Sequence, residues 1–351
     1  MLRAGIASFV CPAKSPGTLA RCLVRKLLCF LAVTVTALSV GRQGLGEDKA
    51  LSIAVIPMGS THEYWKSIHA GAAQAAQELK VDILWKGPLR EDDRNSQIDL
   101  VEDMIAKRVS GIVLAPIDGT ALSRPVGNAA GVGIPVVIVD AALNSDKIVS
   151  FIATDNYKGG VLAGDHLAQL LHNKGQVIML RGLEGSASTM AREQGFLDTV
   201  KKYPGMSVVS SNQHGGITTE TGYQASENLL NAYKSKTGDL SIDGIFCPNE
   251  STTFGMLRAL QDNGYAGKVR FIGFDSSAKL VEAVGKGQID ALVVQDPQRM
   301  GYLGIKTLVG HLKGEKIDRR IDTGATVVTS KNMNEQKIHD LLHPDLKRWL
   351  K

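Results

Sequence analysis

The sequence predicts an α/β protein built as two lobes, each a doubly wound parallel sheet, joined by three hinge crossings. Short apolar, β-branched runs alternate with helix-period stretches from Leu51 onward, at intervals of about 24 to 30 residues, which is typical of βαβ units. The runs are continuously apolar, so both faces of each sheet are expected to be buried. About ten such runs are too many for one compact sheet of ordinary size, which favours two lobes.

The expected strands fall into two series. The first series is Leu51–Pro57, Val81–Trp85, Gly111–Ala115 and Pro135–Val139. The second series is Gln176–Leu180, Ser207–Ser210, Ile242–Cys247, Val269–Ile272 and Ala291–Val294. The stretch after the first strand is a clear amphipathic helix, because its apolar residues recur with helical spacing, at Trp65, Ile68, Ala72, Ala76 and Leu79.

The chain is expected to cross between the lobes near Thr154, Gln295 and Asp322. No Gly/Ser-rich or Pro-rich linker separates the two series, so the crossings are predicted to be short, strand-like hinges. This assigns residues 47–154 plus about 296–323 to the N-terminal lobe. Residues 155–295 plus about 324–351 then form the C-terminal lobe.

Residues 1–46 have the pattern of a secretory signal peptide. Basic residues at Arg21, Arg25 and Lys26 precede Leu27–Val40, a run without charge, and small residues follow it. Because a spanning helix needs about 20 apolar residues, this run is short for an anchor, although an uncleaved signal anchor remains the alternative. Several pairs of small residues are suitably spaced, so the sequence leaves the cleavage position open.

The charge distribution argues against a nucleic-acid-binding domain, and the cysteine content argues against a disulfide-stabilised mature chain. Six of the 40 basic residues and none of the 35 acidic ones precede Glu47, so the remaining chain is close to neutral and lacks the basic excess of a nucleic-acid-binding domain. Three of the four cysteines lie in the leader, and Cys247 is alone in the expected mature chain, so no intramolecular disulfide can form there. Cys247 lies in an apolar run and is interpreted as a core residue.

Ligands of open parallel sheets bind beyond the carboxyl ends of the strands, so the loops after the strands are the candidate site. Polar and aromatic residues recur there, in the segments Met58–Trp65, Lys86–Pro88, Pro116–Asp118, Asp140, Arg181–Gly182, Pro248–Glu250, Asp275–Ser277 and Gln295–Pro297.

The order and composition of these loops resemble those of the ribose-type periplasmic sugar-binding proteins of ABC importers, which are related to the sensor domains of LacI-type repressors. The likeness runs from about Leu51 to Val328. Its most specific segments are Ile134–Asp140, Ala153–Asn156 with Gly159-Gly160, Arg192–Phe196, Asn249, Gly273–Asp275 and Gln295. The resemblance implies the type I periplasmic binding fold, with ligand in the cleft between the lobes.

Carried over position by position, the resemblance implies hydroxyl-binding residues at Asp140, Arg192, Asn249, Asp275 and Gln295, and a pair of aromatic platforms at Tyr64 and Trp65. His62 occupies a position that is Asn in the ribose-type proteins. Two further departures put ribose itself in doubt: the Asp-Arg pair of the family is Asp140-Ala141 here, and Met58 replaces a small polar residue.

These residue types suit a monosaccharide on chemical grounds. Carboxylates accept hydrogen bonds from hydroxyls, Arg donates them in a fork, and Asn and Gln do both. Flat aromatic rings cover the apolar C–H faces of a sugar ring.

Each residue type also has a structural explanation. Tyr64 and Trp65 can be core residues at a helix start, Arg192 a solvated surface charge, and the two aspartates helix caps. Lys86 and Glu250 are weaker candidates for the site, and His69, Trp85 and His214 are weaker still.

The predicted function is therefore capture of a monosaccharide outside the cytoplasm, in the periplasm, and its delivery to an ABC permease. The chain is expected to act as a monomer, without a cofactor, metal or nucleic acid. An exported sugar or quorum-signal receptor for chemotaxis or a sensor kinase is the alternative. An enzyme is disfavoured because no P-loop, HExxH or G-x-S-x-G motif occurs, and a LacI-type repressor because the first 50 residues hold no helix-turn-helix pattern.

Export gives the first prediction. Because the leader has a basic flank and an apolar core, N-terminal sequencing of the protein from the exported fraction of its host should begin between Val40 and Ala50. An intact leader on protein recovered from the cytoplasm would contradict this.

Overall fold

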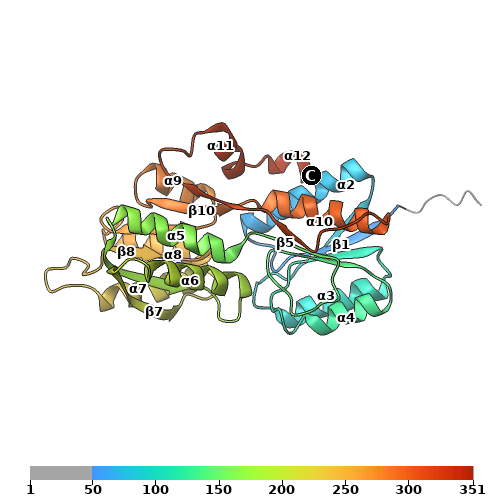
Figure 1. Cartoon of the computed structure of the whole chain (residues 1–351), viewed down its shortest axis with the longest axis horizontal. Helices are drawn as coiled ribbons and strands as arrows, with labels where there is room; N and C mark the ends of the chain where they lie inside the picture. Colours follow the sequence, from blue (N-terminus) through green and yellow to red (C-terminus); the bar gives the residue numbers. More distant parts are fainter. Residues whose placement is uncertain (1–49, 351) are drawn as a thin grey trace, which may run out of the picture. The chain divides into compact units, whose positions relative to one another are not determined.

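The computed structural model describes residues 50–350, which form two six-stranded sheets flanked by helices (Figure 1). The predicted signal peptide lies outside these residues. No helix within residues 50–350 is both long enough and apolar enough to span a membrane. The predicted fold class, two α/β lobes with mainly parallel sheets, is confirmed.

The first lobe is built on the sheet β2-β1-β3-β4-β5-β11, whose strands are all parallel. Its strands are β1 (Ser52–Ile56), β2 (Asp82–Trp85), β3 (Gly111–Leu114), β4 (Val136–Val139), β5 (Ser150–Ala153) and β11 (Arg320–Asp322). Its helices are α2 (Glu63–Leu79), α3 (Arg94–Ala106), α4 (Ser123–Gly131) and α10 (Pro297–Leu312).

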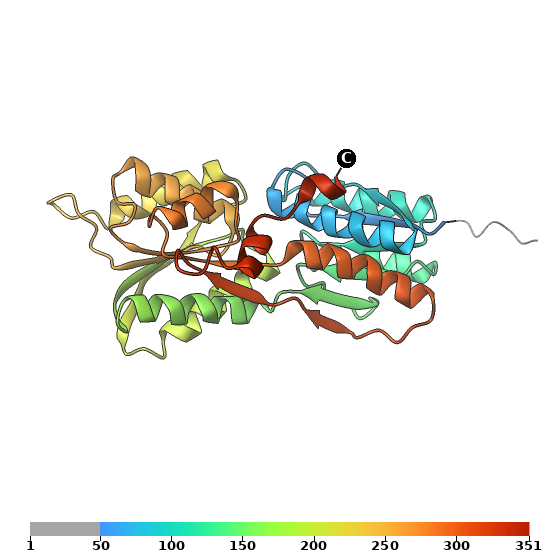
Figure 2. The same ribbon diagram turned by 90° about the horizontal axis from the view of Figure 1, so that it is seen from above.

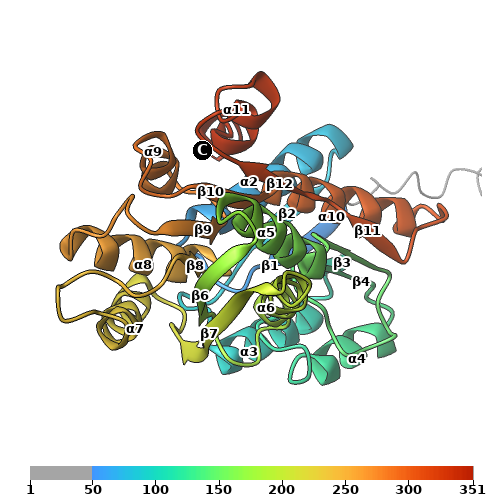
Figure 3. The same cartoon turned by 60° about the vertical axis from the view of Figure 1, so that its left-hand side comes forward.

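The second lobe is built on the sheet β7-β6-β8-β9-β10-β12. Its strands are β6 (Lys174–Arg181), β7 (Gly205–His214), β8 (Gly244–Phe246), β9 (Arg270–Phe274), β10 (Ala291–Gln295) and β12 (Ala325–Val328). Its helices are α5 (Asn156–Leu170), α6 (Ala187–Val200), α7 (Thr219–Ala232), α8 (Glu250–Asp262) and α9 (Ala278–Gly285). Figure 3 shows α5 and α6 over one face of this sheet, and α7 and α8 on its other side.

Each sheet is buried on both faces, which explains the unbroken apolar runs in the sequence. In β1, Ile53 and Val55 pack in the core cluster that includes residues of α2 and α10. The alternate residues Ala54 and Ile56 pack in the cluster with residues of α3 and α4. Successive side chains of a strand point to opposite faces, so one short run supplies two cores.

The two lobes repeat one strand order. Numbered within its lobe, each sheet runs 2-1-3-4-5 and ends with one late strand, β11 or β12. The strands β5, β11 and β12 were absent from the two series of strands expected from the sequence. They are short, and β5 begins with Ser150, a polar residue that is nevertheless fully buried because its hydroxyl donates to the carbonyl oxygen of Asp318 at 2.7 Å. In addition, β12 pairs antiparallel with β10, so the second sheet is mixed.

The chain passes between the sheets at three places, after β5, after β10 and between β11 and β12, and Figure 2 shows β11 and β12 running from one sheet to the other. The Thr154 hydroxyl donates to the Gly324 carbonyl oxygen at 2.9 Å. The Asp322 carboxylate accepts from the backbone N–H groups of Asp155 and Gly324 at 3.0 and 2.8 Å. The first and third passages are therefore tied to each other.

The C-terminal segment bridges the two lobes. Helix α11 (Gln336–Leu342) packs on the core of the second lobe through Ile338 and Leu342. Helix α12 (Leu346–Trp349) instead contacts α2 of the first lobe. Pro344 lies between the two helices, where it favours the change in chain direction. The end of the chain therefore contacts the first lobe. From the sequence, residues 324–351 were expected to belong to the second lobe.

Glycines allow close helix contacts in both lobes. A Cβ on Gly301 of α10 would lie 1.9 Å from the Ile68 carbonyl oxygen of α2. A Cβ on Gly160 of α5 would lie 1.9 Å from the Arg192 carbonyl oxygen of α6. A Cβ on the neighbouring Gly159 would lie 2.9 Å from a ring carbon of Phe274 in β9. The Gly159-Gly160 pair therefore sets how closely α5 approaches both α6 and β9.

Gly160→Ala should lower the free energy of unfolding by about 3 kcal/mol, because the backbone of α6 must move to admit the methyl group. Gly127→Ala in α4 is the matched control: its Cβ would meet nothing within 4 Å, so helix propensity should raise stability by about 0.5–1 kcal/mol. Urea unfolding of the two variants measures both effects, and equal stabilities would contradict the packing described here.

Candidate functional site

One cavity between the lobes gathers the candidate residues. It encloses about 630 Å³ of empty space, part of it continuous with solvent. The first lobe lines it with Met58, His62, Tyr64, Trp65, Glu91, Ile117 and Asp140. The second lobe contributes Leu183, Ser186, Ser188, Thr189, Arg192, Ile217, Asn249, Glu250, Ser251 and Asp275, and Gln295 comes from the second passage between the lobes.

The aromatic pair of the first lobe lies at the start of α2. The rings of Tyr64 and Trp65 meet edge to face, with centroids 5.1 Å apart. The Tyr64 hydroxyl donates to Oδ1 of Asp140 at 2.5 Å, and the Trp65 indole N–H donates to Oε1 of Glu91 at 2.7 Å. Trp65 also packs in the first-lobe core, so its structural and site roles are combined in one side chain.

Arg192 is the central cation of the second lobe and is 3% exposed. Its Nε donates to Oδ1 of Asn156 at 2.8 Å, and its Nη1 donates to the Pro248 carbonyl oxygen at 2.9 Å. The guanidinium lies 3.9 Å from the centroid of the Phe274 ring, and Nη1 lies 3.7 Å from Oδ2 of Asp275. These contacts hold the guanidinium in one orientation, and Nη2 makes no hydrogen bond within residues 50–350. Arg192 is therefore buried, which excludes the alternative that it is a solvated charge on the surface of its helix.

The two aspartates occupy equivalent places in the two lobes. Asp140 directly follows β4 and Asp275 directly follows β9, and both have left-handed backbones, with φ of 67° and 66°. Each backbone N–H still bonds to the neighbouring strand, at Ile152 and Val293 respectively. Aspartate tolerates this conformation better than most residues, and the turn directs the chain away from the sheet. Neither residue caps the helix that follows it, since the N-caps of α5 and α9 are Asp155 and Ser277, so that structural explanation does not apply.

Burial dominates the electrostatics of these carboxyl groups. It raises the pKa of Asp140 and of Asp275, while the Arg192 charge opposes the rise in both. Burial also raises the pKa of Glu91, and burial together with the Asp140 charge raises the Tyr64 pKa well above its usual value. The charged forms of these buried carboxyl groups are therefore disfavoured, even though each accepts one side-chain hydrogen bond.

Asn249 and Gln295 complete the polar wall. Asn249 caps α8, because its Oδ1 accepts from the Thr252 N–H at 3.2 Å, which leaves its amide nitrogen to donate elsewhere. The Gln295 amide nitrogen donates to Oδ1 of Asp275 at 2.6 Å. Its Oε1 is buried without a hydrogen-bond partner within residues 50–350. Oε2 of Glu250 also makes no hydrogen bond there, but it lies 3.6 Å from Nδ1 of His62.

Buried side chains behind the cavity fix its loops. Gln97, fully buried in α3, donates to the carbonyl oxygens of Pro57 and Ala115 at 2.9 and 2.8 Å and accepts from the Ile117 N–H at 2.8 Å. It thereby joins the loops after β1 and β3. In the second lobe, Glu193 accepts from the Gly182 N–H at 3.0 Å. Such buried bonds hold the backbone of each loop in a single conformation.

The structure brings together all eight residues proposed from the sequence as ligand-binding: His62, Tyr64, Trp65, Asp140, Arg192, Asn249, Asp275 and Gln295. Of the weaker candidates, Glu250 lines the cavity, whereas Lys86, His69, Trp85 and His214 do not. His69 stacks on Trp85 at 4.2 Å, and the His214 ring bonds to the Gly182 carbonyl oxygen. Cys247 is buried in the core, where burial raises its pKa.

Sequence reasoning missed Glu91 and the hydroxyl-bearing residues Ser186, Ser188, Thr189 and Ser251. Glu91 lies six residues beyond the end of β2, outside Lys86–Pro88, the segment after this strand that the sequence analysis proposed for the site. Ala141 packs in the first-lobe core cluster and is not among the residues that line the cavity.

Within residues 50–350, no group of three or more His, Cys, Asp or Glu side chains is arranged to hold a metal ion. The cavity instead combines hydrogen-bonding carboxylates, amides, hydroxyls and a guanidinium with aromatic and aliphatic surface. An enclosed site of this kind between two α/β lobes defines a two-lobed ligand-binding protein of the hinged type.

The chain belongs to the periplasmic binding protein family: the family model described as a periplasmic binding protein domain matches residues 53–316. The resemblance inferred from the sequence motifs is confirmed. Ribose import binding protein of Haemophilus influenzae is 28% identical over 87% of this chain and all of its own length.

Two solved structures are similar in fold and sequence. A carbohydrate transporter solute-binding protein of Agrobacterium radiobacter, in complex with D-arabinose, is 36% identical with a TM-score of 0.79, covering 85% of this chain and 100% of that one. An ABC transporter solute-binding protein of Agrobacterium vitis, with bound D-fucose, is 34% identical with a TM-score of 0.78, covering 83% and 100%.

Proposed function

We propose that this protein captures a monosaccharide in the cavity between its lobes and delivers it to the permease of an ABC importer. The observation that carries the proposal is Oε1 of Gln295, a buried acceptor without a donor within residues 50–350, in a wall that also holds Asp140 and Asp275. Buried polar atoms are rarely left unpaired. A ligand rich in hydroxyl groups supplies the missing donor.

The proposed roles follow from the chemistry of each group. Asp140 and Asp275 accept hydrogen bonds from hydroxyls, Arg192 and Asn249 donate them, and Gln295 accepts through Oε1. The rings of Tyr64 and Trp65 cover a C–H face of the sugar. Because donors and acceptors come from both lobes, only the closed arrangement offers the full set, and a permease that contacts both lobes can distinguish loaded from empty protein.

The importer role is favoured over that of a signalling receptor because the curated relatives include several ribose import binding proteins. Those relatives are binding proteins, so the proposal includes no catalytic step. We expect a monomer in the periplasm, released from its leader, with the inner-membrane permease as its protein partner.

The sugar is proposed to be a hexose or deoxyhexose rather than ribose. Met58, Trp65 and Ile117 place apolar surface on the first-lobe side of the cavity, and a ribose hydroxyl against such surface would lose water without gaining a partner. A methyl edge would lose nothing there. The relative with bound D-fucose, a 6-deoxyhexose, agrees with this choice, whereas the relative in complex with D-arabinose holds a pentose, so the choice rests on the apolar surface.

A thermal-shift screen of pentoses, hexoses, deoxysugars and polyols tests the proposed function, because a ligand that binds only the native state raises its apparent stability. A shift with one or a few monosaccharides is the expected result. No shift with any sugar at concentrations far above typical importer affinities would contradict the proposal.

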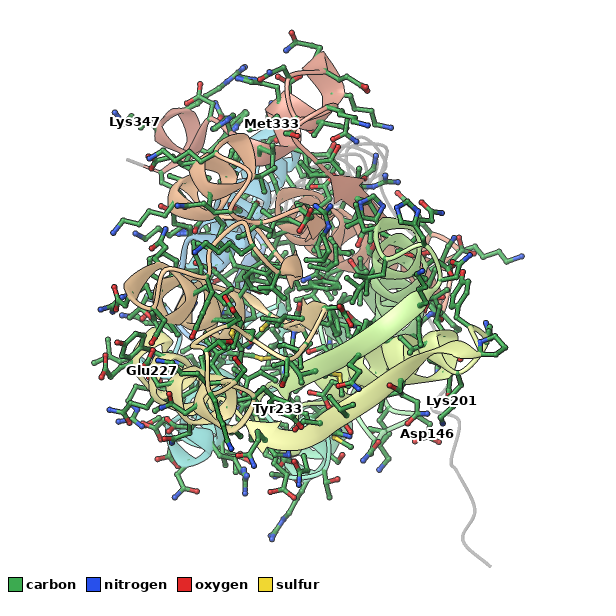
Figure 4. The ribbon with its side chains drawn as sticks, turned by 90° about the vertical axis from the view of Figure 1, so that its left-hand side faces the viewer. Asp146, Lys201, Glu227, Tyr233, Met333 and Lys347 are labelled. Carbon is green, nitrogen blue, oxygen red and sulfur yellow. The ribbon has the colours of Figure 1, made fainter. Side chains whose placement is uncertain are left out.

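Asp140→Asn should weaken binding of the best sugar about ten- to hundredfold, since a charged acceptor is lost. Folding stability should stay equal or rise, because burial disfavours the carboxylate and Asn tolerates the left-handed backbone. Asp146→Asn is the matched control, an exposed residue outside the cavity whose position at the edge of the molecule is seen in Figure 4. Unchanged affinity by calorimetry in Asp140→Asn would exclude the proposed role.

D-fucose or a hexose should bind at least about tenfold more tightly than ribose, a difference of about 1.4 kcal/mol. Met58→Ser should narrow that gap by offering ribose a polar partner where the parent offers a thioether. Calorimetric titration with each sugar decides this, and ribose binding tighter than every hexose and deoxyhexose would overturn the proposed preference.

A further inference from the structure

A single ion pair joins the two lobes across the cavity. Nδ1 of His62, at the start of α2 in the first lobe, lies 3.6 Å from Oε2 of Glu250, the first residue of α8 in the second lobe. Every other ion pair within residues 50–350 lies inside one lobe. Both side chains are largely buried, with exposures of 22% and 18%.

His62 faces carboxylates from both lobes. Contact with Glu250 and the charges of Glu91 and Asp275 raise the pKa of His62 to about 9, although burial opposes the rise. Glu250 and Asp275 belong to the second lobe, and only Glu91 belongs to the same lobe as His62. The cavity's remaining charged groups are engaged elsewhere, Asp140 with Tyr64 and Arg192 with Asn156, Pro248 and Asp275.

We propose that His62 and Glu250 form a proton-coupled clamp, in which closure of the lobes around the sugar takes up a proton on His62. The inference rests on the proposed function, and adds to it a requirement that binding depends on pH. Neither residue is a hydroxyl-binding group in this role; both position the lobes against each other.

The direction of the effect follows from linkage. Opening the lobes removes Glu250 and Asp275, so the His62 pKa returns toward its ordinary value of 6.5. The closed form then holds more protons than the open form between about pH 6.5 and 9. The contribution of the clamp is complete below that window and is lost as the pH rises through it.

The pH profile of sugar binding is the first measurement. Affinity should fall about 10- to 50-fold between pH 7 and pH 9, and close to one proton should be taken up per sugar at pH 8. Calorimetry in two buffers of different ionisation enthalpy, phosphate and Tris, measures that proton directly.

Two variants assign the proton to the clamp. His62→Asn removes the titrating group, so proton uptake should fall to near zero and the affinity should become flat between pH 7 and pH 9. Glu250→Gln keeps His62 but removes its partner charge, so it should reduce the uptake without abolishing sugar binding at pH 6.5. His339→Asn, at an exposed position on α11 outside the cavity, is the matched control and should retain the parent profile.

A pH dependence that persists in His62→Asn would assign the proton to a cavity carboxyl group and overturn the clamp. A flat profile in the parent would overturn it as well, while leaving sugar capture intact.

The contact is also tested without relying on a sugar. The His62 imidazole is titrated by NMR in the parent and in Glu250→Gln, with the best sugar and without ligand. A lower His62 pKa in Glu250→Gln supports the clamp, and an identical pKa in both proteins under both conditions overturns it. Because this result does not require transport or a particular ligand, failure of the clamp and failure of the proposed function are distinguishable.

Discussion

The burial of the Arg192 guanidinium is the interaction on which the site depends. Its position requires the Gly159-Gly160 pair, because Gly160 lets the backbone of α6 approach α5 at Arg192, and Gly159 lets the Phe274 ring lie under the guanidinium. Phe274 is the last residue of β9, so the same contact sets where Asp275 leaves the sheet. Helix packing, cation–π contact and carboxylate placement are therefore one coupled arrangement, and a change in any of them disturbs the others.

The internal repeat explains why such a site forms between the lobes. Each lobe repeats the strand order 2-1-3-4-5, and the fourth strand of each ends in an aspartate with a left-handed backbone. Because parallel sheets present their carboxyl ends at one edge, two facing sheets bring Asp140 and Asp275 to one cavity. The repeat is not symmetric in charge, however. Asp275 has Arg192 and Gln295 beside it, whereas the Tyr64 hydroxyl is the only hydrogen-bond donor to the Asp140 side chain among the described residues. The first-lobe side therefore gains more from the donors of a ligand.

Much of the fold and of the site could be predicted from the sequence, because apolar periodicity and strand-end loops are local signals. β5 escaped the prediction because Ser150 interrupts its apolar run, and its burial depends on a bond to Asp318, distant in sequence. Asp140 and Arg192 were found through their motifs. Glu91 was missed because only the fold brings its loop to Trp65, and the partnership of His62 with Glu250 was missed because it spans 188 positions and two lobes. Contacts of this kind are set by tertiary packing, which no local pattern encodes.

The charge balance of the closed cavity links these observations. Among the described residues that line it, four carry carboxyl groups, Glu91, Asp140, Glu250 and Asp275, and two can be cationic, Arg192 and His62. Arg192 is the only fixed cation among these described residues, and its contacts with Asn156, Pro248 and Asp275 all lie in the second lobe. Burial of an uncompensated carboxylate is costly, and the cost rises when the lobes close and exclude water. In the proposed clamp, protonated His62 adds a positive charge beside Glu250 and Asp275. Because that charge is present only while His62 holds its proton, the proposal makes the stability of the closed cavity depend on pH.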